Sequence, residues 1–261
     1  MPGRRLRRQL RLVPALSVPT ARAVGWAAPL AGFALSLGLL ALAVRPGLEL
    51  PAGRLVLWLR LAMTVGALGC AFLLDDPSEP TTEGVAGSLL LRRSLRVALL
   101  LPATAAWWVG VVWRVQAVHP GLPLPVAALT LEAAALLAVT VALAAAGSRL
   151  APERRGGVVA APALLALTSA AFLLPAQVTL YAQPGSAAWD GAHRRWALLL
   201  GLALAAFALA SRDPAHRRLP SWLRGPAHWR TRTRTRGRAA RAEAGRSGSP
   251  DAAGRVERSV G

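Results

Sequence analysis

The chain has 261 residues, of which 54% are apolar, and a formal net charge of +19 from 31 basic and 12 acidic residues. The apolar residues gather in long uncharged blocks, which soluble cores do not need and which are typical of a polytopic membrane protein. All the basic residues are arginines, so a phosphate loop of the G-x-x-x-x-G-K-[ST] type is excluded. The single cysteine excludes an intrachain disulfide and a cysteine-based zinc site.

The chain begins with a basic segment, residues 1–24, which is followed by an apolar block at residues 25–44. A block of about 20 residues suits a spanning helix better than the shorter apolar core of a signal peptide. No small-residue cleavage site follows it. We therefore expect an uncleaved first span, with the basic segment on the cytoplasmic side.

Six apolar blocks reach, or nearly reach, the length that a helix needs to cross the hydrocarbon core. They are residues 25–44, 55–74, 97–113, 124–147, 157–180 and 196–211. The blocks are continuously apolar and do not alternate, so they favour helices over the strands of a closed barrel. The predicted fold class is all-α, with a bundle of six transmembrane helices over residues 25–211.

Arginines in the connections predict the orientation, because cytoplasmic loops carry the excess of positive charge. With the N-terminus inside, twelve arginines fall on the inner side ahead of the tail and five on the outer side. Six crossings also return the C-terminus to the inner side. The strong preference for Arg and Ala suggests a bacterial genome, so we expect a multi-pass protein of the bacterial cytoplasmic membrane.

The connection at residues 75–96 is acidic at its start and basic at its end. Its charged residues are Asp75, Asp76, Glu79, Glu83, Arg92, Arg93 and Arg96. Pro77 ends the preceding helix, and residues 81–95 could form a short helix along the membrane surface, with opposite charges at its two ends. Such a connection could dock a soluble partner. An ordinary re-entry loop with interfacial charges is the alternative.

Two ionisable residues interrupt the predicted spans, and such residues are functional candidates because they are costly in lipid. Arg60 lies in the second span and Glu132 in the fourth, at similar predicted depths below the outer surface. We expect them to form an intramembrane ion pair. The pair could be a packing clamp with no transport role, or Arg60 could extend to the interface and leave Glu132 facing a polar cavity.

Small residues and prolines give weaker packing signals. Ala62, Gly66 and Cys70 recur at i, i+4 and i+8 in the second span, a spacing that permits close helix approach. Pro162 and Pro175 within the fifth span predict bends.

Residues 212–261 are rich in Arg, Gly, Pro and Ser and have little apolar periodicity, so we expect a disordered cytoplasmic tail. Anionic lipid would attract it, and tryptophans could anchor it at the interface. The residues expected to face lipid are Arg217, Arg218, Trp222, Arg224, Trp229 and Arg230. Nucleic-acid binding needs little beyond positive charge and is the less favoured alternative.

Catalytic patterns are missing from the sequence. None of the four histidines has metal-ligand spacing on a helix, and serines and threonines in the spans lack a nearby His or Lys base. We therefore expect no enzyme activity, no metal site and no cofactor.

Three stretches, "FLLDDPSEPTTEG", "LTLEAAALL" and "AHRRWALLLGLALAAFALASRDPAHRR", resemble small six-span actinobacterial membrane proteins that are called ABC transporter membrane subunits or permease-like proteins. The resemblance covers about residues 25–218. It implies a separate ATPase subunit, which would dock on the connection after span two, and a homodimer or a second membrane subunit. The expected function is therefore that of a permease-like subunit in export. The alternative is a membrane scaffold that transports nothing and recruits lipid or a partner through its tail.

Overall fold

The structure is a computed structural model that describes residues 25–48, 50–75, 89–150, 155–175 and 177–212. Within these ranges it contains helices and no strand. The helices are α2 (Ala27–Ala43), α3 (Ala52–Cys70), α4 (Leu89–Val118), α5 (Val126–Leu150), α6 (Gly156–Phe172) and α7 (Trp189–Ala210). The predicted all-α class is confirmed for this part of the chain.

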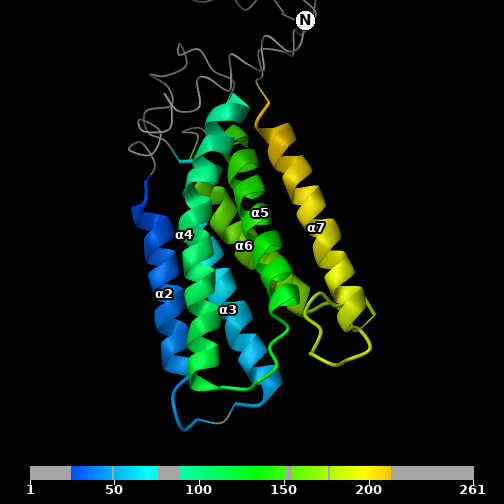
Figure 1. Cartoon of the computed structure of the whole chain (residues 1–261). Helices are drawn as coiled ribbons and strands as arrows, with labels where there is room; N and C mark the ends of the chain where they lie inside the picture. The colour runs from blue at the N-terminus through cyan, green and yellow to red at the C-terminus, as the bar shows by residue number, and fades with distance from the viewer. Residues whose placement is uncertain (1–24, 49, 76–88, 151–154, 176, 213–261) are drawn as a thin grey trace, which may run out of the picture. The chain divides into compact units, whose positions relative to one another are not determined.

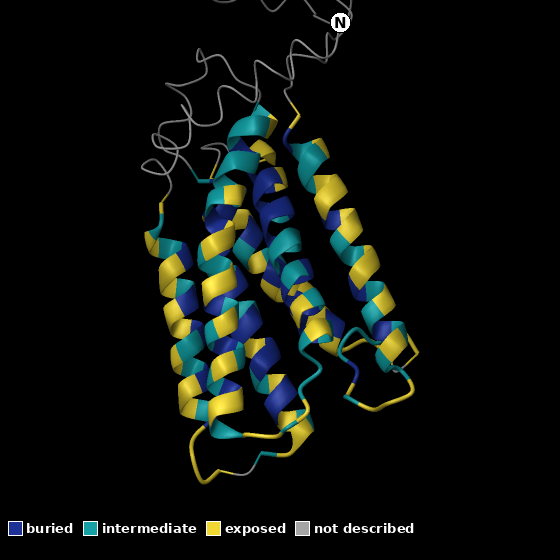
Figure 2. Cartoon of the chain, in the orientation of Figure 1, coloured by how far each residue is buried: buried dark blue, intermediate teal, exposed yellow. Residues whose placement is uncertain are grey.

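Successive helices run in alternate directions, so Gly25 and Arg212 lie at the same end of the bundle (Figure 1). Helix α5 is central and packs against α3, α6 and α7, while α2 packs against α3. Helix α4 makes its main helix contact with α2 rather than with α5. Burial follows this arrangement, because α3 and α5 carry most of the buried residues (Figure 2).

Four helices, α3, α4, α5 and α7, are long and apolar enough to cross a membrane. Helices α2 and α6 are equally apolar in character but have 17 residues each. Large apolar side chains also cover the outside of the bundle. Leu35, Leu198 and Leu202 are each about two-thirds exposed. A surface of this kind fits hydrocarbon rather than water, so the chain has the properties of a membrane-embedded protein.

Three helix boundaries differ from the sequence-based expectation by about two turns. The surface helix expected over residues 81–95 is wrong in its described part, because Leu89 already begins α4, which continues through Pro102 to Val118. No helix-breaking residue separates Leu89 from the following apolar run, so one helix forms. Helix α6 ends at Phe172 and leaves Pro175 outside, so the expected bend there is also wrong. Helix α7 begins at Trp189, two turns before the expected residue 196.

Gly32 of α2 and Gly69 of α3 allow the backbones of these two helices to approach closely. A Cβ atom built on Gly32 would lie 2.8 Å from the Cα of Gly69. The predicted small residues Ala62, Gly66 and Cys70 are all buried, and a Cβ atom on Gly66 would lie 2.7 Å from the Trp107 ring. Small residues therefore admit both a backbone and an indole at this face of α3.

Candidate functional site

Arg60 of α3 and Glu132 of α5 form a bidentate ion pair between helices that are 72 residues apart in sequence. Arg60 Nε donates to Glu132 Oε2 at 2.8 Å, and Arg60 Nη2 donates to Oε1 at 2.7 Å. Both side chains are buried, with 5% and 0% exposure. Two parallel charge-assisted bonds fix the rotation of both helices about their axes, which a single bond would not do.

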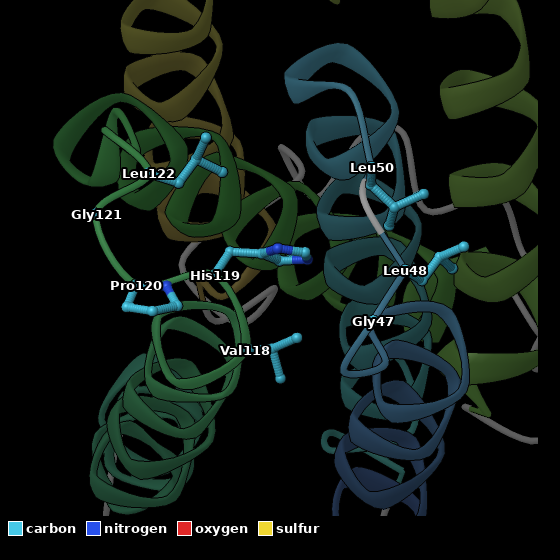
Figure 3. A pocket seen from close by; sticks show the side chains of 8 residues that line it. All are labelled: Gly47, Leu48, Leu50, Val118, His119, Pro120, Gly121 and Leu122. Atoms are coloured by element: carbon cyan, nitrogen blue, oxygen red, sulfur yellow. The ribbon is translucent and has the colours of Figure 1, made fainter.

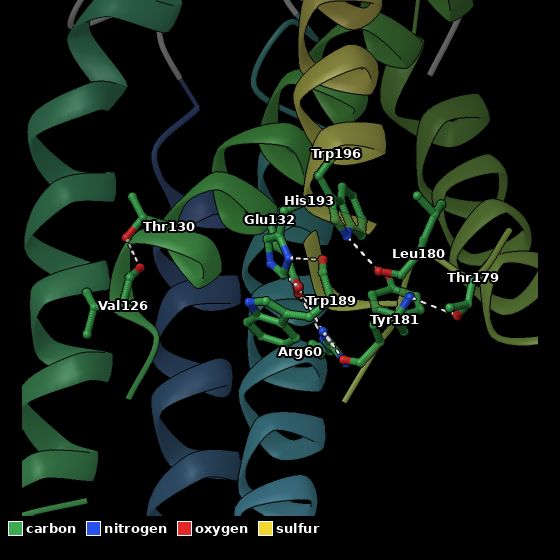
Figure 4. Close-up of polar contacts among 11 residues, drawn as sticks. Arg60, Val126, Thr130, Glu132, Thr179, Leu180, Tyr181, Trp189, His193 and Trp196 are labelled. Atoms are coloured by element: carbon green, nitrogen blue, oxygen red, sulfur yellow. Dashed lines mark hydrogen bonds and ion pairs between the residues drawn. The ribbon is translucent and has the colours of Figure 1, made fainter. Parts of the chain in front are cut away.

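The same guanidinium also holds the connection between α6 and α7. Arg60 Nη2 donates to the carbonyl of Ala182 at 3.0 Å, and its Cζ lies 5.1 Å from the centre of the Tyr181 ring. Tyr181 in turn stacks on Phe172 and contacts Trp196, whose Nε1 donates to the carbonyl of Leu180. Arg60 therefore joins α3, α5 and this connection at one point (Figure 4).

His193 of α7 completes the cluster. Its Nε2 lies 3.2 Å from Glu132 Oε1, and its Nδ1 lies 2.8 Å from the carbonyl oxygen of Trp189 (Figure 4). A carbonyl only accepts, so Nδ1 must donate, and Nε2 can then bond to Glu132 only if a proton lies on Nε2 or on the carboxyl group. We name Arg60, Glu132 and His193 the clamp.

The clamp lies below the ends of its helices. Arg60 is eight residues after the start of α3 and Glu132 six after the start of α5, so both lie about 9–12 Å from those ends. The predicted pairing of Arg60 with Glu132 is confirmed. His193 was missed, because it precedes the sixth span predicted at residues 196–211. The available signal was the run "WDGAHRRW", in which Trp189, His193 and Trp196 have helical spacing ahead of the apolar block.

A second polar cluster lies at the opposite end of the bundle, around Arg93 of α4. Arg93 is buried, with 5% exposure. Its Nη2 donates to Ser148 Oγ at 2.6 Å, and its Nη1 lies 3.3 Å from the carbonyls of Ala145 and Ala210. Arg149 also donates to the carbonyl of Ala210. We name Arg93, Ser148 and these two carbonyls the bridge. It ties α4 to the C-terminal ends of α5 and α7, where cations are favourable.

Asp75 caps α6 from a distant part of the chain. Its Oδ1 accepts a hydrogen bond from the backbone N–H of Gly157 at 2.9 Å, close to the first turn of that helix. Burial raises the pKa of the Asp75 carboxyl above its ordinary value of 3.8, against the opposite effects of the Gly157 and Gly156 amides and the charge of Arg155. Asp75 thus has a structural partner inside the bundle.

The residues predicted to dock a partner therefore do not form one group in the structure. Arg93 lies inside the bundle, Arg96 Nη1 lies 3.5 Å from the carbonyl of Leu74, and Arg92 is half-buried in the first turn of α4. Asp76, Glu79 and Glu83 lie outside the described residues, as do the six tail residues predicted to face lipid. Those six are Arg217, Arg218, Trp222, Arg224, Trp229 and Arg230.

The structure also contains two cavities whose lining includes no residue of the clamp or the bridge. One, of about 600 Å³, is formed by the connections α2–α3 and α4–α5, with His119 beside Leu48 and Leu50 (Figure 3). Two glycines with positive φ, Gly47 and Gly121, make the turns on its sides. The other, of about 530 Å³, lies between α4, α5 and α7 and is almost wholly apolar.

Among the described residues, no group of three or more His, Cys, Asp or Glu side chains could hold a metal ion. Cys70 is buried and makes no disulfide.

Comparison of the chain with protein-family models, with curated proteins and with solved structures found no match.

Proposed function

We propose that the chain is a permease-like membrane subunit of an ABC-type export system that works with a separate ATPase. The observation that carries the proposal is the alternating arrangement of six apolar helices with both described ends at one end of the bundle (Figure 1). The sequence has no lysine-containing phosphate loop, so ATP hydrolysis would have to come from another chain. The resemblance to actinobacterial permease-like proteins supports the same assignment.

The proposal requires six crossings, including the two short helices. A 17-residue helix spans about 26 Å, slightly less than a hydrocarbon core of about 30 Å. Apolar residues continue past both helices, with Val44 after α2 and Leu173 and Leu174 after α6. Local thinning of the bilayer accommodates a mismatch of this size at modest cost.

The proposal places the end with Gly25 and Arg212 on the cytoplasmic side of a bacterial membrane. The segments at this end contain more arginines than the connections at the opposite end, as the positive-inside rule requires for the cytoplasmic side. The ATPase would then meet the residues around the start of α4. Asp75 and Arg93 have partners within the bundle. The contact surface for the ATPase would therefore be centred on the other acidic residues of the connection, Asp76, Glu79 and Glu83.

The experiment is capture of the native ATPase on the tagged full chain, followed by identification of the bound protein and measurement of its ATP hydrolysis. The test variant changes Asp76 to Asn and Glu79 and Glu83 to Gln, and leaves Asp75 and Arg93 intact so that the bundle keeps their contacts. The matched control changes Arg45 and Arg54, which are exposed at the opposite end. We expect the test variant to lose the ATPase and the control to retain it.

Either of two results would contradict the proposal. If the wild-type chain captures no nucleotide-hydrolysing subunit, that result favours the alternative function, a scaffold that recruits lipid or a partner and transports nothing. If the test variant binds the ATPase as well as the wild type does, the connection after α3 is not the docking surface.

A further inference from the structure

The cavity between α4, α5 and α7 lies along α4. Hydrogen bonds join α4 to its neighbours at two levels, and between these levels α4 is separated from them. At one level Trp108 Nε1 donates to Thr130 Oγ1 at 2.9 Å. At the other level Arg93 Nη2 donates to Ser148 Oγ at 2.6 Å. Between these two bonds lies the cavity of about 530 Å³, which we name the groove. We propose that the groove binds one acyl chain of an anionic phospholipid.

The surface of the groove is suited to hydrocarbon. Its lining residues come from α4, α5 and α7, and none of them is charged. Two of its hydroxyl groups are already bonded within their own helices, since Thr104 Oγ1 donates to the carbonyl of Leu100 and Thr130 Oγ1 to that of Val126. These hydroxyls need no polar ligand. An apolar gap of this size in a bilayer takes up hydrocarbon, because interiors seldom keep voids much larger than a water molecule.

The dimensions of the groove select a single chain. From Ser94 to Trp108 it runs about 21 Å along α4, which exceeds the half-thickness of about 15 Å of the hydrocarbon core. Its volume over that length gives a mean cross-section of about 25 Å².

Charge at one end of the groove selects the headgroup. Besides Arg93, which is buried in the bridge, Arg92 and Arg96 lie at this end in the first two turns of α4, and Arg149 lies there in the last turn of α5. The bridge ties α4 to α5 at this end, while the bond between Trp108 and Thr130 lies at the other. An acyl chain would therefore enter from the arginine end, with its anionic headgroup among the guanidinium groups. In the proposed topology this is the cytoplasmic leaflet.

This inference goes beyond the proposed function, because it requires insertion into a membrane and no ATPase. Its test uses the purified full chain reconstituted in phosphatidylcholine vesicles that contain a minor fraction of phosphatidylglycerol. Native mass spectrometry after extraction into mild detergent counts the phospholipids retained on each chain. We expect the wild type to retain one phosphatidylglycerol. Failure to find an ATPase would leave this count unchanged.

The test variant is Ala134→Phe, which places a ring in the groove, and the matched control is Ala206→Phe on α7. Ala134 lines the groove, whereas Ala206 is exposed and does not line it. We expect Ala134→Phe to lose the phosphatidylglycerol and Ala206→Phe to keep it. If Ala134→Phe fails to fold, Leu204→Trp fills the groove from α7 and gives the same readout.

A third variant, Arg92→Gln, tests recognition of the headgroup separately from binding of the acyl chain. We expect its preference for phosphatidylglycerol over phosphatidylcholine to fall several-fold while one phospholipid remains bound. Three results would overturn the proposal. They are retention of phosphatidylglycerol by the groove-filling variants at the wild-type level, equal retention of the two phospholipids by the wild type, and a disulfide between two copies of Leu101→Cys, which would place a second chain on the groove.

Discussion

The clamp and the bridge lie at opposite ends of the bundle, and each provides partners for a buried arginine, but the kinds of partner differ. Each buries an arginine at 5% exposure between three elements. Arg60 meets a carboxylate through two short bonds, while Arg93 meets a hydroxyl and two backbone carbonyls. The carbonyls belong to the C-terminal ends of α5 and α7, which carry partial negative charge and lie near the interface. A guanidinium deeper in the bundle has no such helix ends within reach and needs a full countercharge.

This difference predicts that the stability of the protein depends more strongly on the Glu132 carboxylate of the clamp than on the Ser148 hydroxyl of the bridge. Replacing Glu132 with Leu would leave Arg60 buried without its carboxylate, and we expect a loss of about 3–5 kcal/mol in unfolding free energy. Unfolding by sodium dodecyl sulfate in mixed micelles, followed by tryptophan fluorescence, measures it. Adding Arg60→Met should recover much of the loss. If the double variant is no more stable than Glu132→Leu, the buried charge is not the cause.

Removal of the bridge should cost less. We expect Arg93→Met to lower the unfolding free energy by about 1–3 kcal/mol, because Ser148 has a second bond to the carbonyl of Ala145 and the interface can hydrate the freed carbonyls. The same titration measures this effect, with Arg194→Met on the exposed side of α7 as the control. A loss as large as that of Glu132→Leu would show that the two clusters do not differ in the way described.

The imidazole of His193 should contribute less than the ion pair that it joins. His193→Phe keeps a ring against Trp189, whose centroid lies 4.2 Å from that of the imidazole, and removes the contact with Glu132. We expect a loss of about 0.5–1.5 kcal/mol in unfolding free energy. A loss equal to that of Glu132→Leu would place His193 among the obligatory partners of the carboxylate, and no loss would remove it from the clamp.

The smallest expected effect concerns Asp75, beside the bridge end of the bundle. Because its pKa is raised in the folded state, its contribution to stability is present below its ordinary pKa of 3.8 and decreases as the pH rises through the folded value. Asp75→Asn keeps an oxygen acceptor for Gly157 and does not ionise. We therefore expect the difference in stability between wild type and variant to change with pH in the acidic range and to be constant above it. A difference independent of pH would exclude this explanation.

The apolar blocks predicted the all-helical class, because a backbone in hydrocarbon must satisfy its hydrogen bonds within one segment. The sequence also pointed to Arg60 and Glu132 as partners, because each interrupts an apolar run at a similar depth. The lengths of α4, α6 and α7 were less predictable. Charged and aromatic residues at their ends can lie in a helix or in a loop, and hydropathy alone does not decide between them.

Composition and the continuous apolar blocks by themselves predicted apolar helices long enough to cross a membrane and the pairing of Arg60 with Glu132. Only the tertiary structure decided that His193 joins the pair, that Asp75 caps α6, and that Arg93 lies inside the bundle rather than on a docking helix. The physical reason is distance along the chain. Each of these contacts joins residues at least 50 positions apart, and such contacts depend on which helix faces turn toward one another. Spacing along one helix carries no information about the face that its neighbour presents.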